Sequence, residues 1–199
     1  RWQTMLWQNE NLGLIFENKG TTAKPKIRIS VFSKKKLSSE FIESLKQEII
    51  WRYNLDLDLS EFYRTVGKAP FLRPVIKRFY GLRPMHAGSL YEYLIIAIVL
   101  QNATVRRSVS MMQTLFENYG TLLEFAGEKL WCFWEPEVLA KAKEQRLRDL
   151  KMGYRARSLI KVSVPFIAGR MPGIPLRVIK KEIDEMRLRK ADRKAQEES

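Results

Sequence analysis

Two short stretches of the chain carry side chains whose types and spacing suit a binding or chemical role. The first is Gly153-Tyr154-Arg155-Ala156, where a polar segment gives way to an apolar one. Glycine permits a tight corner, which would present Tyr154 and Arg155 at an exposed bend. A ring beside an arginine suits entry into a stack of bases, because the ring replaces lost stacking and the guanidinium offers a planar donor fork to a base edge. The alternative is that the pair simply packs and extends along apolar surface at a helix start.

The second stretch is an amide-rich corner, Gln101-Asn102, with two basic residues, Arg106 and Arg107, close behind it. It follows residues 90–100, which are apolar nearly all round and predict a helix with no solvent face at the centre of a core. After the corner, apolar residues return at helical spacing and predict a second helix that faces a core. These residues are Val105, Val109, Met112, Leu115 and Phe116. A buried helix is therefore expected to deliver amides and arginines to the surface.

The charge balance favours a polyanionic partner. The net charge is +14 and the isoelectric point is near 10.0. Lysines and arginines that neutralise phosphates release counterions and supply much of the affinity for nucleic acid. A highly charged thermophilic surface and a ribosome-associated protein are the other interpretations of this composition.

Several other classes of protein are disfavoured. The chain has one cysteine, Cys132, and one histidine, so it can build neither a disulfide framework nor a zinc site, and it suits a reducing compartment. No apolar run reaches the roughly 18 residues that a membrane span needs. No cofactor is expected. Asp56 and Asp58 could form a carboxylate pair, but aspartates at a helix start more often satisfy free N–H groups and the helix dipole.

The first part of the chain predicts a small antiparallel sheet. Residues 2–7, 12–16 and 26–32 are short strand-like runs, and the last of them alternates with period two. Asn18-Lys-Gly20 supplies turn residues before that strand. Three short strands need a helix to cover one face.

The expected cover is the next segment, capped by Ser38 or Ser39. Its apolar stripe consists of Phe41, Ile42, Leu45, Ile49 and Trp51. Helices are then expected almost throughout, and the later ones include a helix at 122–125 and others at 137–150, 159–168 and 176–194. The fold class is therefore α+β, with a sheet lobe over residues 1–58 and a mainly helical lobe over residues 59–199. A cluster of aromatic residues, Trp131, Phe133 and Trp134, is expected to lie in the core.

The order of features along the chain resembles a known family. An apolar helix is followed by Gln-Asn, an arginine, a helix ending in Tyr-Gly, an aromatic and Pro-Glu segment, and Leu-Arg-x-Leu-x-x-Gly-Tyr-Arg-Ala-Arg. Gly81-Leu-Arg83, Glu92, Gln101-Asn102 and Gly153–Ala156 are the anchoring matches. Over roughly residues 60 to 168 this order resembles the helix-hairpin-helix superfamily of base-excision DNA glycosylases. The preceding sheet is similar to the amino-terminal lobe of the 8-oxoguanine and alkyladenine branches.

The resemblance implies roles for individual positions. Gln101 stands where 8-oxoguanine glycosylases have an asparagine that fills the gap left by a flipped nucleotide. Arg106 matches an arginine on the estranged base, Tyr154 matches the wedge, and Arg155 matches a second arginine on that base. Asn102 and Arg157 complete the expected DNA-binding set. Such parts are needed because a glycosidic bond inside a duplex is out of reach until its base is extruded.

One family signature is not reproduced. The family has a Leu-Pro-Gly-Ile-Gly-like hairpin, followed in the bifunctional branches by a catalytic lysine and about twenty residues later by an aspartate. The nearest string here, Met171–Pro175, ends in proline, which has no N–H for a phosphate. Lys180, Lys181 and Asp184 follow too closely to reproduce the spacing. No catalytic residue is therefore assigned, and the hairpin is expected beyond Ser199.

The resemblance implies a fragment of a DNA glycosylase that flips a damaged base from duplex DNA and cleaves its N-glycosidic bond, possessing or lacking lyase activity. The chain alone is expected to be inactive, because the hairpin and the catalytic lysine and aspartate are not present. The alternative is a basic nucleic-acid-binding module without catalysis. The expected partner is damaged double-stranded DNA, with no membrane. The protein is expected to be a monomer inside the cell, in the cytoplasm or nucleoid. The lesion, the opposite-base preference and the mono- or bifunctional mechanism stay open.

Overall fold

The computed structural model describes residues 1–21, 24–85 and 89–167. Its contacts divide the chain into two compact units. One comprises Arg1 and Ile15–His86, and the other comprises Trp2–Leu14 and Ala87–Ser199. Met171–Pro175, Lys180, Lys181, Asp184 and the helix expected at 176–194 lie outside the described residues. The division into units reflects contacts between residues and does not test the predicted domain boundary at residue 58. That boundary therefore stays a prediction.

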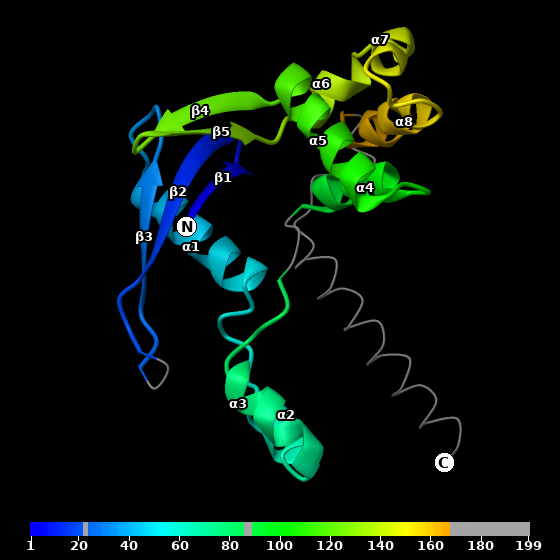
Figure 1. Ribbon diagram of the computed structural model, residues 1–199. Helices are drawn as coiled ribbons and strands as arrows, with labels where there is room; N and C mark the ends of the chain where they lie inside the picture. Colours follow the sequence, from blue (N-terminus) through cyan, green and yellow to red (C-terminus); the bar gives the residue numbers. More distant parts are fainter. Residues whose placement is uncertain (22–23, 86–88, 168–199) are drawn as a thin grey trace, which may run out of the picture. The chain divides into compact units, whose positions relative to one another are not determined.

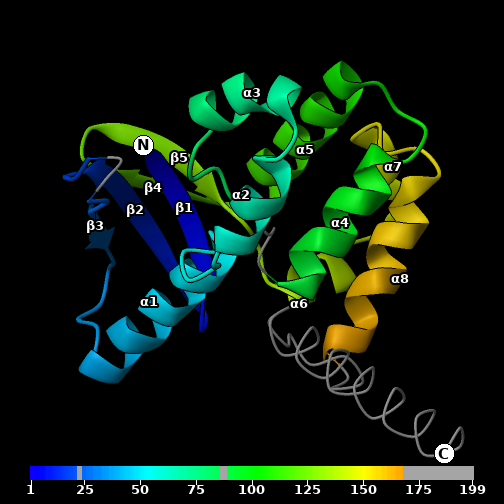
Figure 2. The same cartoon turned by 90° about the horizontal axis from the view of Figure 1, so that it is seen from below.

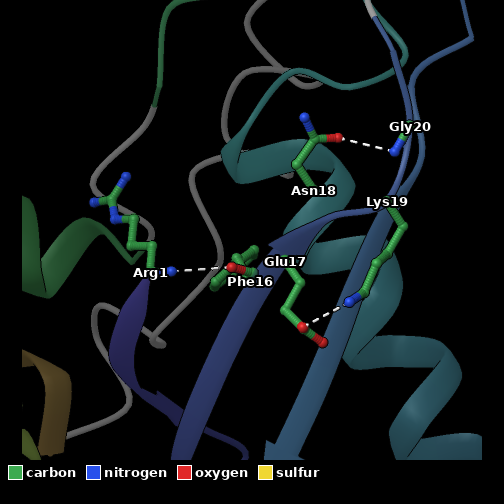
Figure 3. Close-up of polar contacts among 6 residues, drawn as sticks. All are labelled: Arg1, Phe16, Glu17, Asn18, Lys19 and Gly20. Atoms are coloured by element: carbon green, nitrogen blue, oxygen red, sulfur yellow. Dashed lines mark hydrogen bonds and ion pairs between the residues drawn. The ribbon is translucent and has the colours of Figure 1, made fainter.

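A three-stranded sheet has the order β1-β2-β3 and confirms the predicted strands (Figure 1). Its strands are β1 (Trp2–Trp7), β2 (Glu10–Asn18) and β3 (Ile27–Phe32). After β2, the Asn18 side chain accepts a hydrogen bond from the Gly20 N–H at 3.0 Å (Figure 3). Lys19 pairs with Glu17 at 2.8 Å in the same turn. The predicted turn is therefore present, and the Asn18 side chain stabilises it.

The covering helix of the first unit is α1 (Ser39–Arg52), and Ser38 caps it by accepting the Phe41 N–H at 3.2 Å. Residues of α1 and β3 line a common cavity of about 570 Å³, so α1 lies against β3. Leu45 and Ile49 are buried as predicted, whereas Ile42 is exposed. The other buried residues of α1 are charged, Glu48 and Arg52, and their side chains pair at 3.1 Å.

Three short helical segments complete the first unit: α2 (Ser60–Val66), η1 (Pro70–Leu72) and α3 (Arg73–Arg78). Asp58 accepts the Ser60 N–H at 2.8 Å at the start of α2. Hydrogen bonds from Ser60 lower the pKa of Asp58. These contacts support the interpretation that Asp58 accepts a free N–H group at the start of the helix, and not the interpretation that it belongs to a catalytic carboxylate pair.

The second unit contains a hairpin where a helix was expected. Residues 121–125 form β4 (Thr121–Phe125), which pairs antiparallel with β5 (Glu128–Cys132). Ala126 and Gly127 between them have φ of +49° and +81°, the pair of positive values that a two-residue hairpin turn needs. Leu123 and Phe125 are buried while Leu122 is exposed, so the burial pattern has the period of a strand. The predicted helix at 122–125 is wrong.

The remaining elements are helices. They are α4 (Leu90–Leu100), α5 (Val105–Tyr119), α6 (Pro136–Ala140), α7 (Glu144–Asp149) and α8 (Arg155–Ile167). The helix predicted over residues 90–100 and the next one, ending at Tyr119, are confirmed, and those predicted from residue 137 onward differ in extent. The single helix expected at 137–150 is two helices, and the helix expected from residue 159 begins at Arg155. Among the described residues, α4 and α8 pack side by side and α6 packs on α8 (Figure 2). The predicted α+β class is confirmed.

The core of the second unit joins α4 and α5 to α6, α7 and α8. Ile95 and Val99 of α4 are fully buried against Leu115 of α5 and Leu159 of α8. The Phe133 and Trp134 rings stack within this core, with centroids 4.2 Å apart, which confirms the predicted aromatic core. The prediction that α4 has no solvent face is wrong at two positions, because Tyr93 and Leu100 are exposed.

A buried chain of hydrogen bonds fixes α4 to α8. Ser163 Oγ donates to the Leu159 carbonyl at 2.8 Å, and Trp134 Nε1 donates to Tyr91 Oη at 3.3 Å. Tyr91 Oη lies 2.9 Å from Ser163 Oγ, and these neighbours leave it as the donor. Burial raises the pKa of Tyr91 to about 12, so the phenol keeps its proton.

Replacing Tyr91 with phenylalanine should lower the free energy of unfolding by about 1–2 kcal/mol, because Trp134 and Ser163 each lose a partner in a buried site. The matched control is Tyr93→Phe on the same helix, where the lost hydroxyl is exposed and leaves no buried group without a partner. Urea unfolding followed by tryptophan fluorescence measures both variants. An equal midpoint for the two would contradict a stabilising role for the buried hydrogen-bond chain.

Candidate nucleic-acid interface

The first corner lies where α4 ends. Gln101 is the C-cap residue, and its N–H reaches the Ile98 carbonyl at 3.4 Å. Asn102 then takes a left-handed conformation with φ of +46°, which asparagine tolerates better than most residues. Two residues later Thr104 caps α5 by accepting the Arg107 N–H at 3.3 Å. Between the two helices the chain therefore turns sharply, and Gln101 and Asn102 are exposed.

The second corner lies between α7 and α8. Lys151 and Gly153 have φ of +62° and +59°, and the buried Met152 lies between them. The Met152 N–H reaches back to the Leu147 carbonyl of α7 at 3.1 Å. Glycine suits the positive φ at position 153, so the tight corner predicted from the sequence is present. The first residue of α8, Arg155, follows directly.

The two corners are in contact with each other. Tyr154 Oη donates to the Gln101 carbonyl at 3.4 Å, and Nη2 of Arg155 donates to the same carbonyl. In the opposite direction Nη2 of Arg107 donates to the Lys151 carbonyl at 2.7 Å. Residues about fifty positions apart in sequence thus form one surface element, called here the paired corners (residues 101–107 and 151–157).

The two residues of the Tyr-Arg pair differ in exposure. Tyr154 is 54% exposed, as expected for a side chain that enters a partner. Arg155 is only 7% exposed, and its Cζ lies 4.6 Å from the centroid of the Tyr154 ring. The prediction that Arg155 lies at an exposed bend is therefore wrong. The cause is the Gln101 carbonyl, which draws the guanidinium inward from α8.

The remaining predicted binding residues are at the surface. Arg106 lies in the first turn of α5 and Arg157 lies in the first turn of α8, and both are exposed. With Gln101 and Asn102 they place amide and guanidinium groups on the paired corners. Such groups suit phosphate oxygens and base edges.

The apolar face of α5 differs from the one predicted. Val105 and Val109 are 80% and 63% exposed, although their spacing predicted contact with a core. The face that is buried runs through Ser108, Met111 and Leu115. Burial is thus confirmed for Leu115, and Met112 and Phe116 are partly buried against the same core as predicted. Ser108 tolerates burial because its hydroxyl donates to the Thr104 carbonyl at 3.1 Å. Val105 is thereby left exposed within the paired corners, and Val109 is left exposed just beyond them.

Other kinds of chemistry find little support in the part of the chain that the structure describes. There, no group of three or more His, Cys, Asp and Glu side chains is placed to hold a metal ion. Burial raises the pKa of the Cys132 thiol to about 12, which keeps it protonated and unreactive. None of the described helices has the length and apolarity to cross a membrane.

Arg107 was expected beside the first corner but was given no individual role, and Lys151 was not predicted as a member of this site. Nothing local distinguishes Arg107 from its neighbour Arg106, since both are arginines in the first turn of α5. Only the tertiary placement of the Lys151 carbonyl gives Arg107 its contact. A sequence signal for this contact would have required knowing that the two corners meet.

Two comparisons with known proteins agree on one family. The family model described as HhH-GPD superfamily base excision DNA repair protein matches residues 95–197. A DNA-3-methyladenine glycosylase of Bacillus subtilis (strain 168) is 29% identical over 137 residues, which cover 63% of this chain and 45% of that protein.

Solved structures share the fold at low identity. The 3-methyladenine DNA-glycosylase from Archaeoglobus fulgidus has a TM-score of 0.63 at 17% identity, covering 81% of this chain and 54% of its own. The Clostridium acetobutylicum 8-oxoguanine glycosylase/lyase, solved with double-stranded DNA containing cytosine opposite 8-oxoG, has a TM-score of 0.56 at 17% identity, covering 91% and 59%.

The chain spans about half the length of these relatives. The family model alone matches more than half of the chain, and the paired corners lie largely within its span. The resemblance noted from the sequence is thus confirmed. The chain belongs to the HhH-GPD superfamily of base excision DNA repair proteins.

Proposed function

We propose that the chain is the DNA-gripping part of a DNA glycosylase of base excision repair. In this proposal the paired corners bind duplex DNA and hold it open at a damaged base. One observation carries this proposal: a half-exposed tyrosine is fixed against an amide-rich corner with exposed arginines beside it. The net charge of +14 suits a phosphate backbone. Membership of the family supplies the reaction class.

The proposed roles divide between the two corners. Tyr154 enters the base stack, and Gln101 occupies the gap left by the extruded nucleotide. Arg106 contacts the estranged base, while Asn102 and Arg157 hold the sugar-phosphate backbone. Cleavage of the N-glycosidic bond is assigned to none of the described residues. The protein would act as a monomer on chromosomal DNA, in the cytoplasm or nucleoid.

The 199-residue chain should bind a duplex with a central abasic-site analogue about tenfold more tightly than the same duplex intact, because a pre-opened stack removes an unstacking cost of a few kcal/mol. Fluorescence anisotropy at several salt concentrations measures both duplexes and the matching single strand. Affinity should fall steeply with salt for all three, as phosphate contacts require. Equal affinity for the two duplexes would reject the grip on opened DNA.

Release of a base separates the enzyme from the binding module. Duplexes that carry either an 8-oxoguanine or an alkylated purine are incubated with the full-length protein and treated with alkali, which nicks any strand that has lost a base. Nicking supports the glycosylase. Selective lesion binding by the full-length protein without nicking favours the non-catalytic module. Borohydride trapping of a covalent adduct then distinguishes a lysine nucleophile from activated water.

A further inference from the structure

The carboxyl end of α4 lacks a cation of its own. The last turn of this helix contains no basic residue, and Gln101 caps it. A helix end presents carbonyl groups without intrahelical donors and carries a partial negative charge. The Gln101 carbonyl accepts from the Arg155 guanidinium and from the Tyr154 hydroxyl. The start of α8 therefore supplies the positive charge that α4 lacks.

The reverse contact comes from α5. Arg107 Nη2 donates to the carbonyl of Lys151 at 2.7 Å, just after α7 ends. Lys151 is itself strained, with φ of +62°, and its N–H bonds the Arg148 carbonyl at 2.8 Å. Each corner thus contributes one arginine to a backbone carbonyl of the other.

Arg155 is held in a way that opposes contact with DNA. Its guanidinium lies against the Tyr154 ring and bonds the Gln101 carbonyl, and Nε is buried without a hydrogen-bond partner among the described residues. Reaching a base edge would break both of these contacts. Arg106, by contrast, is exposed at the start of α5.

We propose that Arg155 and Arg107 are positioning residues that cap the two corners reciprocally, and that Arg155 does not read the estranged base. The caps make Tyr154 and Gln101 move as one element. This differs from the base-contacting role that the family resemblance gives to Arg155. The part of the inference that concerns DNA rests on the proposed function.

Hydrogen exchange in the free protein tests the caps without any DNA. The reporters are the amides of Gln101 and Met152, one in each corner and each hydrogen-bonded to its preceding helix. Arg155→Ala should accelerate exchange at Gln101, and Arg107→Ala should accelerate it at Met152, each by roughly tenfold through local opening. Arg155→Lys should restore part of the protection, because a cation remains near the end of α4.

The control is Arg148→Ala, which removes an exposed arginine that pairs with Glu144 on its own helix, α7. It should leave exchange at Gln101 unchanged. If each arginine variant alters exchange only within its own corner, the reciprocal caps are rejected. If the thermal midpoint collapses in Arg155→Ala, the milder Arg155→Lys variant carries the comparison.

A second measurement decides whether Arg155 reads a base. Four duplexes place the abasic analogue opposite A, C, G or T. Arg155→Ala should weaken all four by the same factor, about tenfold, because a loosened wedge is indifferent to the opposite base. Arg106→Ala should weaken them unequally.

A loss in Arg155→Ala that differs more than about fivefold among the four duplexes, which is the lower end of the discrimination that one base contact provides, would assign Arg155 to base reading and overturn the proposal. A wild-type chain that does not prefer the abasic duplex would instead contradict the proposed function. In that case the hydrogen-exchange comparison still decides whether the arginines cap the corners.

Discussion

Replacing Tyr154 with alanine should weaken binding to the abasic-analogue duplex by roughly ten- to a hundredfold, since stacking of an aromatic side chain on a base contributes about 1–3 kcal/mol. The ring is 54% exposed while its hydroxyl and face are held by Gln101 and Arg155, so it is both available and oriented. Binding to the single strand should fall much less. Fluorescence anisotropy with the two DNAs at one salt concentration measures the ratio.

Two variants separate the ring from the rest of the surface. Tyr154→Phe keeps the ring and removes only the long hydrogen bond of 3.4 Å, so it should stay within about threefold of the wild type. Tyr93→Ala removes a tyrosine that is 55% exposed on α4 and should not change DNA binding. Equal losses for the abasic duplex and the single strand in Tyr154→Ala would reject the wedge role.

The place of each corner along the chain could be anticipated, because the sequence marks each one. Gly153 needs a positive φ, and Gln101-Asn102 interrupts an apolar helix. Their closeness in space followed only from the family resemblance, since about fifty residues separate them. The structure places them in contact, and the individual roles on DNA stay predictions.

The faces of helices were harder to predict than their existence. On α5, two sets of residues have helical spacing, and the set with more valines was expected to be buried. The structure buries Leu115 of that set but exposes Val105 and Val109. Ser108 is buried in their place, since a hydroxyl bonded to its own helix costs little in a core. Residues 122–125 were misassigned for another reason. The two-residue Ala-Gly turn that follows them was overlooked, although Leu123 and Phe125 alternate with exposed neighbours.

Buried charges were the features that the sequence could not reveal. Arg155 and Arg52 look like surface residues in the sequence, and each is buried by a partner: a backbone carbonyl for the first and Glu48 for the second. Charged side chains are rarely buried unless paired. Composition and periodicity describe one element at a time, so a partner that neutralises a charge within the fold is visible only in the structure.

The pair on α1 carries the largest expected effect on stability. Glu48 is 1% exposed, and its carboxylate lies 3.1 Å from Nε of Arg52 one turn later. Breaking such a pair leaves an uncompensated charge in the interior, which typically costs 3–5 kcal/mol. An exposed pair on the same helix, Glu43 with Lys46 at 3.1 Å, offers the matched comparison because water replaces the lost partner.

Glu48→Ala is therefore expected to lower the free energy of unfolding by about 3–5 kcal/mol, whereas Glu43→Ala should cost less than about 1 kcal/mol. Urea unfolding followed by circular dichroism measures both. The double variant Glu48→Leu with Arg52→Met removes both charges and keeps apolar volume, so it should recover most of the loss. If Glu48→Ala costs no more than Glu43→Ala, or if the double variant is as unstable as Glu48→Ala, the cost does not come from an orphaned charge. The helix that covers β3 would then depend on the packing of its aliphatic residues alone.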